Sequence, residues 1–216
     1  MTIYILTIKK KGKRTLPCWE LFGLPKSGKT TFLSVLTKKG YQTMQVVQKN
    51  TALKIFNFLK YVIKYPFSTS YLFFKLNTNQ LPLSNLRFWD KLLTSRMRNS
   101  YLGAVLAKCE TLVMYSKPIV DEFMLQSLFM IIQSRSSVKE LQKIIDNMPL
   151  SEKIFLVETS KRTRDQRLKS IRKPARVLDP YYKALWIENS EYNYAIIKEI
   201  LLNYYTLKKF NLDTRK

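Results

Sequence analysis

The chain has 216 residues, of which 46% are hydrophobic and 25% are charged, which is typical of a folded globular protein rather than a disordered one. It contains 38 lysines and arginines against 15 aspartates and glutamates, so its formal net charge is +23. It has no histidine, which excludes a Ser-His-Asp triad, a histidine general base and a histidine metal ligand. The basic balance favours anionic partners such as nucleotides, nucleic acid, sugar phosphates or anionic lipid.

The two cysteines and the apolar segments indicate the compartment. Cys18 and Cys109 lack metal-ligand spacing, so we expect two small buried thiols in a reducing environment. No apolar run approaches the length of about 18 residues that a transmembrane helix needs. The apolar residues 1–8 are followed by basic residues, whereas a secretory signal has the reverse order. We therefore expect a cytoplasmic protein without a transmembrane segment.

Residues 1–16 form an N-terminal extension before the first core strand. Ile3, Ile5 and Ile8 in this extension predict either an added edge strand or a loose segment. The remainder, residues 17–213, is expected to form one domain, since its length is sufficient to bury a substantial core.

Residues 23–30, Gly-Leu-Pro-Lys-Ser-Gly-Lys-Thr, match the phosphate-binding pattern G-x-x-x-x-G-K-[ST] at every fixed position. Residues 19–22, Trp-Glu-Leu-Phe, predict a short buried strand before them, and residues 31–37 predict a helix that ends near Gly40. A strand, a glycine loop and a helix in this order direct backbone N–H groups towards an anion. The alternative is a chance glycine turn, which is improbable for a full match in a chain with only 5 glycines.

The loop residues have expected roles in binding ATP and Mg²⁺. Gly23 and Gly28 would allow the backbone to approach phosphate oxygens closely. Lys29 would contact the β- and γ-phosphates, and the Thr30 hydroxyl would ligate Mg²⁺. The candidate nucleotide-binding residues are Gly23, Lys26, Ser27, Gly28, Lys29, Thr30 and Thr31.

Residues 50–100 form a predicted helical region. The pattern predicts a short strand at residues 44–47 and helices at residues 54–65, 68–75 and 85–97. Residues 54–65 alternate apolar and basic side chains up to Pro66. We favour a helix with its apolar stripe in the core and its lysines in solvent, and the alternative is peripheral contact with an anionic membrane.

Asp121 is the candidate acidic partner of the loop. The pattern predicts a helix at residues 99–116, a buried strand at 117–120 and helices at 123–134 and 136–147. An acidic residue at the carboxyl end of a parallel strand lies at the edge where α/β sheets bind ligands. We expect Asp121 to complete the Mg²⁺ shell through water or to accept a proton from an incoming hydroxyl. The alternative, which we favour less, is that it caps the following helix.

Arginines are concentrated at residues 161–176, after a strand predicted at 153–158. The guanidinium fork suits phosphate oxygens, and a mobile arginine segment could close over transferring phosphates, so Arg167 and Arg172 are candidate catalytic residues. The alternatives are a solvated helix face and a nucleic-acid patch. The chain then predicts helices at residues 179–186 and 191–205 and a strand at 207–212. About five strands alternating with helices imply an α/β fold with a parallel sheet covered on both faces.

These features together resemble a small P-loop kinase of the nucleoside-monophosphate-kinase group, including its thymidylate-kinase-like branch. The resemblance is carried by residues 23–30, Asp121 and the arginine run. It implies a three-layer P-loop NTPase, with an acceptor-binding helical region at residues 50–100 and an arginine lid at 160–178. Residues 120–128 also resemble a stretch in ATP-binding proteins associated with bacterial surface-polysaccharide synthesis.

The resulting functional prediction is ATP-dependent phosphoryl transfer to a small nucleotide, nucleoside or sugar-type acceptor. Lys29, Asp121, Arg167 and Arg172 are the expected catalytic residues, and Thr30 and Asp121 are the expected Mg²⁺ ligands. Arg87, Arg96 and Arg98 fit recognition of an anionic acceptor and solvated surface equally well. The alternative is a regulatory ATPase that binds nucleic acid or a membrane, which the +23 charge supports. No RNA- or DNA-binding motif is evident, so nucleic acid is not favoured.

Overall fold

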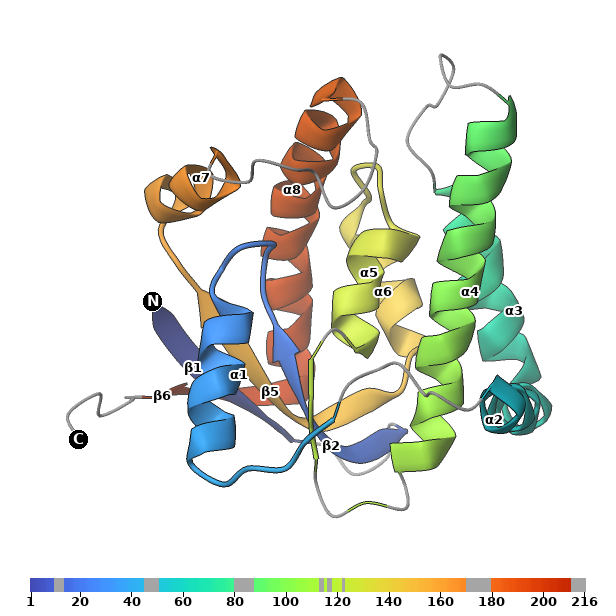
Figure 1. The fold of residues 1–216 in the computed structure, drawn as a ribbon, viewed down its shortest axis with the longest axis horizontal. Coiled ribbons are helices and arrows are strands. Elements are labelled where there is room, and N and C mark those ends of the chain that lie inside the picture. Colours follow the sequence, from blue (N-terminus) through green and yellow to red (C-terminus); the bar gives the residue numbers. More distant parts are fainter. Residues whose placement is uncertain are drawn as a thin grey trace.

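The structure is a computed structural model, and it describes residues 1–9, 14–44, 51–79, 88–112, 115, 118–121, 123–169 and 180–210 (Figure 1). The strands are β1 (Thr2–Ile8), β2 (Thr15–Phe22), β3 (Thr43–Met44), β4 (Ile119–Val120), β5 (Leu150–Glu158) and β6 (Tyr205–Phe210). The helices are α1 (Lys29–Lys38), α2 (Thr51–Lys64), α3 (Pro66–Thr78), α4 (Phe88–Leu112), α5 (Met124–Ile131), α6 (Val138–Asp146), α7 (Lys161–Lys169) and α8 (Pro180–Tyr204).

The described strands form one open sheet in the order β3-β4-β2-β5-β1-β6. β3, β4, β2 and β5 are parallel to one another, whereas β1 is antiparallel to both β5 and β6. The predicted α/β class with helices flanking a sheet is confirmed. The prediction of an entirely parallel sheet is wrong, because the sheet is mixed.

The reversal of β1 follows from the short connection that leads to β2. Only residues 9–14 join the two strands, which is too short for a crossover between parallel strands. The chain therefore turns back, and β1 pairs with strands from the far end of the chain, with Ile3 opposite Val157 of β5. The extension does form a strand, but β1 lies between β5 and β6 and not at the sheet edge.

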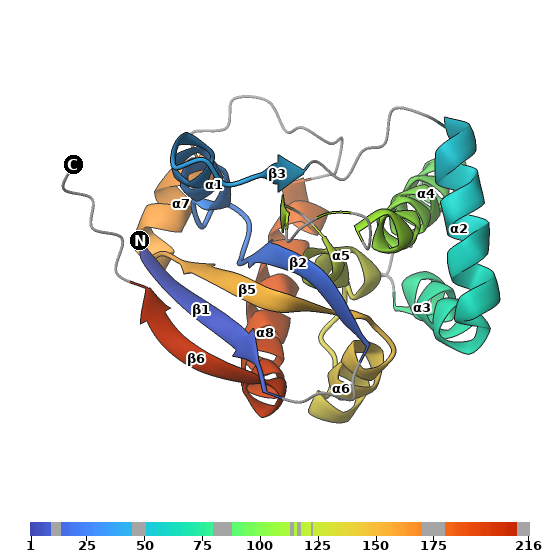
Figure 2. The ribbon, with the colours of Figure 1, turned by 90° about the horizontal axis from the view of Figure 1, so that it is seen from below.

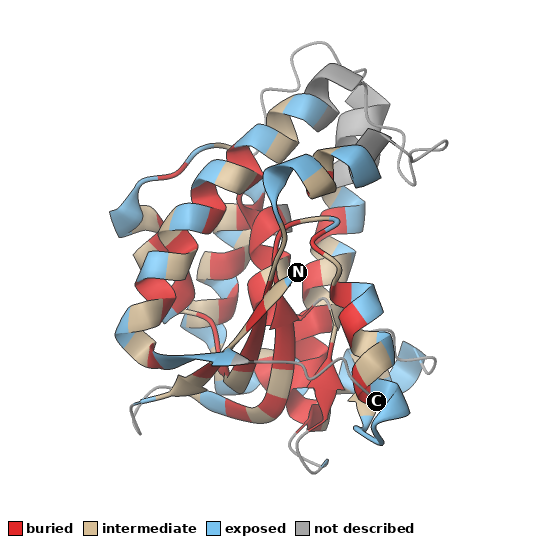
Figure 3. Ribbon diagram, turned by 90° about the vertical axis from the view of Figure 1, so that its left-hand side faces the viewer, coloured by how far each residue is buried: buried red, intermediate tan, exposed pale blue. Residues whose placement is uncertain are grey.

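The two faces of the sheet are covered unequally (Figure 2). On one face, Phe32 and Leu36 of α1 pack against Leu21 of β2. On the other face, α4, α5, α6 and α8 contribute to a larger apolar core, in which the rings of Phe22 and Phe129 stack at 5.6 Å between centroids. Leu21 and Phe22 point to opposite faces because successive strand residues alternate. Buried residues accordingly concentrate in the strands and in the helix faces that meet them (Figure 3).

Two long helices replace pairs of shorter predicted ones. α4 continues through residue 98, where we expected a break, and arginine is a good helix former. The Arg98 Nη2 donates a hydrogen bond to the Leu76 carbonyl at 2.8 Å. α8 continues through residue 189, where the Asn189 side-chain amide donates to the Gln133 carbonyl at 2.9 Å and so bonds to a neighbouring segment and not to its own backbone.

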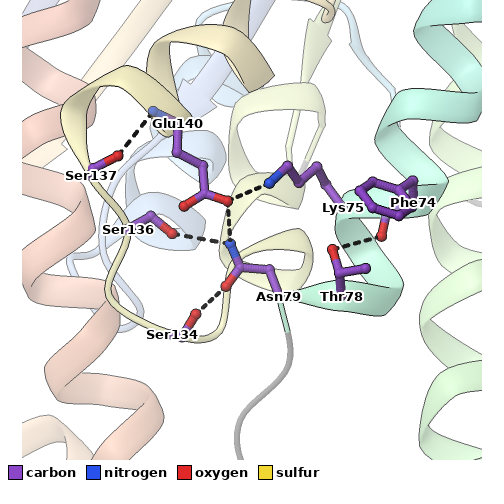
Figure 4. A network of polar contacts seen from close by, with 8 residues as sticks. All are labelled: Phe74, Lys75, Thr78, Asn79, Ser134, Ser136, Ser137 and Glu140. Atoms are coloured by element: carbon purple, nitrogen blue, oxygen red, sulfur yellow. Dashed lines mark hydrogen bonds and ion pairs between the residues drawn. The ribbon is translucent and has the colours of Figure 1, made fainter.

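A polar network joins the end of α3 to the start of α6 (Figure 4). The Asn79 amide donates to Ser136 Oγ at 3.1 Å and to Glu140 Oε1 at 3.3 Å, and its carbonyl oxygen accepts from Ser134. Lys75 Nζ forms an ion pair with Glu140 Oε1 at 2.5 Å. These contacts hold the α2–α3 arm against the helices that cover the sheet.

Candidate functional site

The glycine loop, residues 23–30, leaves the carboxyl end of β2 and enters α1 at Lys29. Two residues of the loop have left-handed backbone conformations, Lys26 with φ 64° and Gly28 with φ 104°. Gly28 is the N-cap of α1, and its carbonyl accepts from the Phe32 N–H at 3.0 Å. The loop therefore places backbone N–H groups around the positive end of a helix dipole, which is an arrangement suited to an anion.

Gly23 is required by the close approach of β5. A Cβ atom at this position would lie 2.4 Å from the carbonyl oxygen of Val157. At Gly28, a Cβ atom would lie 3.0 Å from Met1 Sδ and 3.2 Å from Arg167 Nη1. The turn of the loop is thus enclosed by β5, the start of β1 and α7.

Lys29 is buried and folds back along the loop. Its Nζ donates to the carbonyl of Gly23 at 2.8 Å and to that of Leu24 at 3.2 Å. The Ser27 hydroxyl is also buried, and it has no hydrogen-bond partner within the described part of the chain. The loop thus combines a cationic side chain with a buried hydroxyl, and both are groups that phosphate oxygens bind. Thr30 and Thr31 are exposed on the first turn of α1.

Arg167 reaches the glycine loop from α7. Its Nη1 donates to the Lys26 carbonyl at 3.1 Å, and the residue is otherwise exposed. Arg164 has a different role, because it is buried and forms an ion pair with Glu191 of α8, which anchors α7. Arg172 lies outside the described residues. The structure therefore brings one of the two predicted catalytic arginines to the loop.

Asp121 directly follows β4, the strand beside β2. Val120 pairs with Glu20, so Asp121 lies at the same edge of the sheet as the start of the glycine loop. α5 begins three residues later, and its N-cap, Phe123, makes no side-chain capping bond. The N–H groups of Leu125 and Gln126, in the first turn of α5, donate to Glu20. The role of Asp121 towards Mg²⁺ or an acceptor hydroxyl stays a prediction.

Glu20 is a site residue that the sequence pattern did not reveal. Its side chain is fully buried, and Oε1 accepts from the N–H groups of Leu125 at 2.6 Å and Gln126 at 3.3 Å. Oε2 accepts from Ser151 Oγ at 3.0 Å. Burial raises the pKa of Glu20 to about 7, these hydrogen bonds oppose the rise, and the charge of Asp121 adds to it. The sequence feature that could have identified Glu20 is an acidic residue within an otherwise apolar strand, three positions before Gly23.

Of the three arginines that fit recognition of an acceptor, the structure describes Arg96 and Arg98. Arg98 is buried in α4, and burial lowers its pKa to about 10. Its bond to the Leu76 carbonyl gives it a structural role between α3 and α4. Arg96 is exposed, and Arg87 lies outside the described residues.

Two further properties of the described residues bear on cofactors and membranes. They contain no group of three or more His, Cys, Asp or Glu side chains placed to hold a metal ion. Mg²⁺ is usually held by one or two protein oxygens together with water and phosphate, so Thr30 and Asp121 remain chemically suitable candidates. None of the helices within the described ranges combines the length and hydropathy needed to cross a bilayer. Cys18 and Cys109 are both buried and unpaired, as predicted.

Taken together, the site is a glycine loop at the carboxyl edge of an α/β sheet, flanked by an arginine from α7 and a carboxylate after β4. No family model, no curated protein and no solved structure matches the chain.

Proposed function

We propose that the chain binds ATP with Mg²⁺ at the glycine loop and transfers its terminal phosphoryl group to a small-molecule acceptor. The observation that carries the proposal is the position of the loop between β2 and α1, with left-handed Lys26 and Gly28. Four parallel strands with helices on both faces support a three-layer P-loop NTPase as the finer description of the fold.

The loop residues would hold the triphosphate. Lys29 Nζ now donates to two carbonyls of the loop, and these bonds would be exchanged for bonds to phosphate oxygens. The buried Ser27 hydroxyl would likewise gain a hydrogen bond to a phosphate oxygen. The exposed Thr30 hydroxyl would ligate Mg²⁺, which when bound neutralises charge on the phosphates.

Arg167 and Asp121 would act on the transfer itself. Arg167 contacts the loop through the Lys26 carbonyl, and its guanidinium would stabilise charge developing on a phosphoryl group bound there. Asp121 would hold Mg²⁺ through water or accept the proton of the acceptor hydroxyl as the new phosphorus–oxygen bond forms. Arg172 keeps its predicted role as a second lid arginine.

The test is ADP release from Mg·ATP with a panel of nucleosides, nucleotides, sugars and sugar phosphates. Lys29→Ala removes a charge-assisted contact, so we expect about 10- to 100-fold weaker ATP binding and loss of acceptor-dependent release. Lys38→Ala, an exposed lysine at the end of the same helix, is the matched control and is expected to leave both unchanged. ATP binding unaffected by Lys29→Ala would contradict the proposal.

The net charge of +23 favours a second candidate, a regulatory ATPase that acts on nucleic acid or on a membrane. This candidate predicts tight ATP binding without acceptor-dependent turnover. It also predicts that ATP changes the affinity for DNA, RNA or vesicles, whereas the kinase proposal requires no such linkage.

A further inference from the structure

Helix α2 has an inner face that packs against the rest of the protein. Tyr61 is fully buried, and Asn57 Nδ2 donates to Thr111 Oγ1 of α4 at 3.1 Å. Phe58 lies over Gly103 of α4, with ring atoms 3.8 Å from where a Cβ at Gly103 would be. These contacts account for one side of α2.

The opposite side of α2 is apolar and exposed. Ile55, Leu59 and Ile63 recur every four residues, so they share one face of the helix, and Phe56 lies beside them. Phe56 is 64% exposed and Ile63 is 80% exposed. We call these four residues, Ile55, Phe56, Leu59 and Ile63, the outer stripe. Single exposed apolar residues are ordinary, but four that share one exposed side of a helix mark an interaction surface.

The outer stripe lies on a peripheral helix. Figure 2 shows α2 on the far side of the molecule from β6, with α3 and α4 between it and the sheet. Its position is separate from the glycine loop, so an occupant of the stripe need not compete with a nucleotide.

Lysines border the outer stripe along one side. Lys60 and Lys64 lie 3.6 and 3.7 Å from the two oxygens of Glu110, whose side chain is only 6% exposed. One carboxylate therefore faces two ammonium groups, which leaves a net positive charge, and both lysine side chains remain more than half exposed. The same lysines line a shallow hollow together with Phe56, Leu59 and Ile63.

We propose that α2 docks the protein on an anionic phospholipid surface through the outer stripe. An amphipathic helix of this kind lies in the plane of the interface, where its apolar side chains enter the boundary between head groups and acyl chains. Lys60 and Lys64 are placed to contact lipid phosphates, and the +23 charge of the chain attracts the protein to such a surface. The combination of charge and aliphatic and aromatic side chains selects this partner. The proposal uses no residue of the glycine loop and goes beyond the proposed function.

The first experiment is sedimentation of the full chain with vesicles of phosphatidylcholine, with and without phosphatidylglycerol. We expect binding to the anionic vesicles that weakens with salt. Phe56→Gln combined with Ile63→Gln should weaken this binding about tenfold or more without changing net charge. Val138→Gln removes a comparably exposed apolar residue, 56% exposed on α6, and should leave binding unchanged.

The second experiment separates insertion of α2 from adsorption by net charge. Ile63→Cys and Val138→Cys are each labelled with an environment-sensitive fluorophore, and the two native cysteines are buried, so labelling is selective. A blue shift on anionic vesicles is expected at position 63 and not at position 138. Circular dichroism checks that each variant is folded. Equal binding of the wild type and the double variant, equal spectra at the two positions, or no binding to anionic vesicles would each overturn the proposal.

Discussion

Two regions of the molecule differ in how buried charge and apolar surface are accommodated. The first region is strand β2 with the glycine loop, and the second is the helical layer α2–α4. In the first region, the buried Glu20 accepts three hydrogen bonds, and Gly23 fits tightly beneath the Val157 carbonyl. In the second region, Lys108 of α4 is 1% exposed, and its Nζ has no hydrogen-bond partner among the described residues. The same layer presents the outer stripe to solvent.

The two regions are suited to different purposes. Both carboxylate oxygens of Glu20 accept hydrogen bonds, so this side chain favours a single arrangement. The helical layer retains a desolvated ammonium and an exposed apolar row, and both are unfavourable for an isolated folded chain. Such departures from local consistency are expected at sites that act on a partner.

The largest expected effect is at Gly23. Gly23→Ala would place a Cβ atom 2.4 Å from a backbone oxygen, so β5 or the loop must move. We expect the free energy of unfolding to fall by about 3 kcal/mol or more, measured by urea denaturation. Gly103→Ala is the control, because its Cβ would make an ordinary contact with Phe58 and alanine favours the helix. A Gly23→Ala protein as stable as the wild type would show that the fit of the loop is not tight.

Lys108 tests the helical layer directly. Burial lowers the pKa of Lys108 to about 8 from 10.5, so the folded state is destabilised by the charge at pH 7. Lys108→Met should raise the free energy of unfolding by about 3 kcal/mol at pH 7. Above pH 8 the folded wild type loses this proton. The difference in the free energy of unfolding between Lys108→Met and the wild type should therefore shrink as pH approaches 10.5. A destabilised Lys108→Met protein would indicate that the ammonium has a favourable role.

The pH dependence of stability at Glu20 tests the region around β2. Its folded pKa of about 7 lies above the ordinary value of 4.5, so the folded chain binds the proton more strongly than the unfolded chain between these limits. The contribution of Glu20 to stability is therefore complete below pH 4.5 and is lost as pH rises through 7. Glu20→Gln should match the wild type at low pH and exceed its stability by about 3 kcal/mol at pH 8. A constant difference across this range would exclude titration of Glu20 as its cause.

The elements that the sequence predicted are those determined by local pattern. The spacing of residues 23–30 requires a strand, a loop and a helix in succession, and the structure has all three. Arg167 was predicted as a lid residue from its arginine-rich segment, and it lies against the loop. Fixed spacing and local chemistry carry this information without knowledge of distant contacts.

The features that the sequence did not predict depend on partners far along the chain. The place of β1 inside the sheet depends on pairing with β5, about 150 residues away. Arg98 of α4 and Asn189 of α8 bond to segments far from them in the sequence. The burial of Glu20 depends on the start of α5, and no periodicity in residues 15–22 identifies that contact. These are tertiary effects that override local preference.

The smallest expected change in the free energy of unfolding is at Ile63, and it tests whether the outer stripe contributes to folding. Because Ile63 is 80% exposed, Ile63→Gln should change the free energy of unfolding by less than about 0.5 kcal/mol. Tyr61→Gln, two residues earlier on the inner face, should be strongly destabilising, since it replaces a fully buried ring. Both are read from urea denaturation at one pH. A marked loss of stability in Ile63→Gln would mean that the outer stripe is packed within the folded protein, and lipid docking by α2 would then lose its structural basis. A neutral result leaves Ile63 without a role in folding, which is the condition that docking of this side chain on a lipid surface requires.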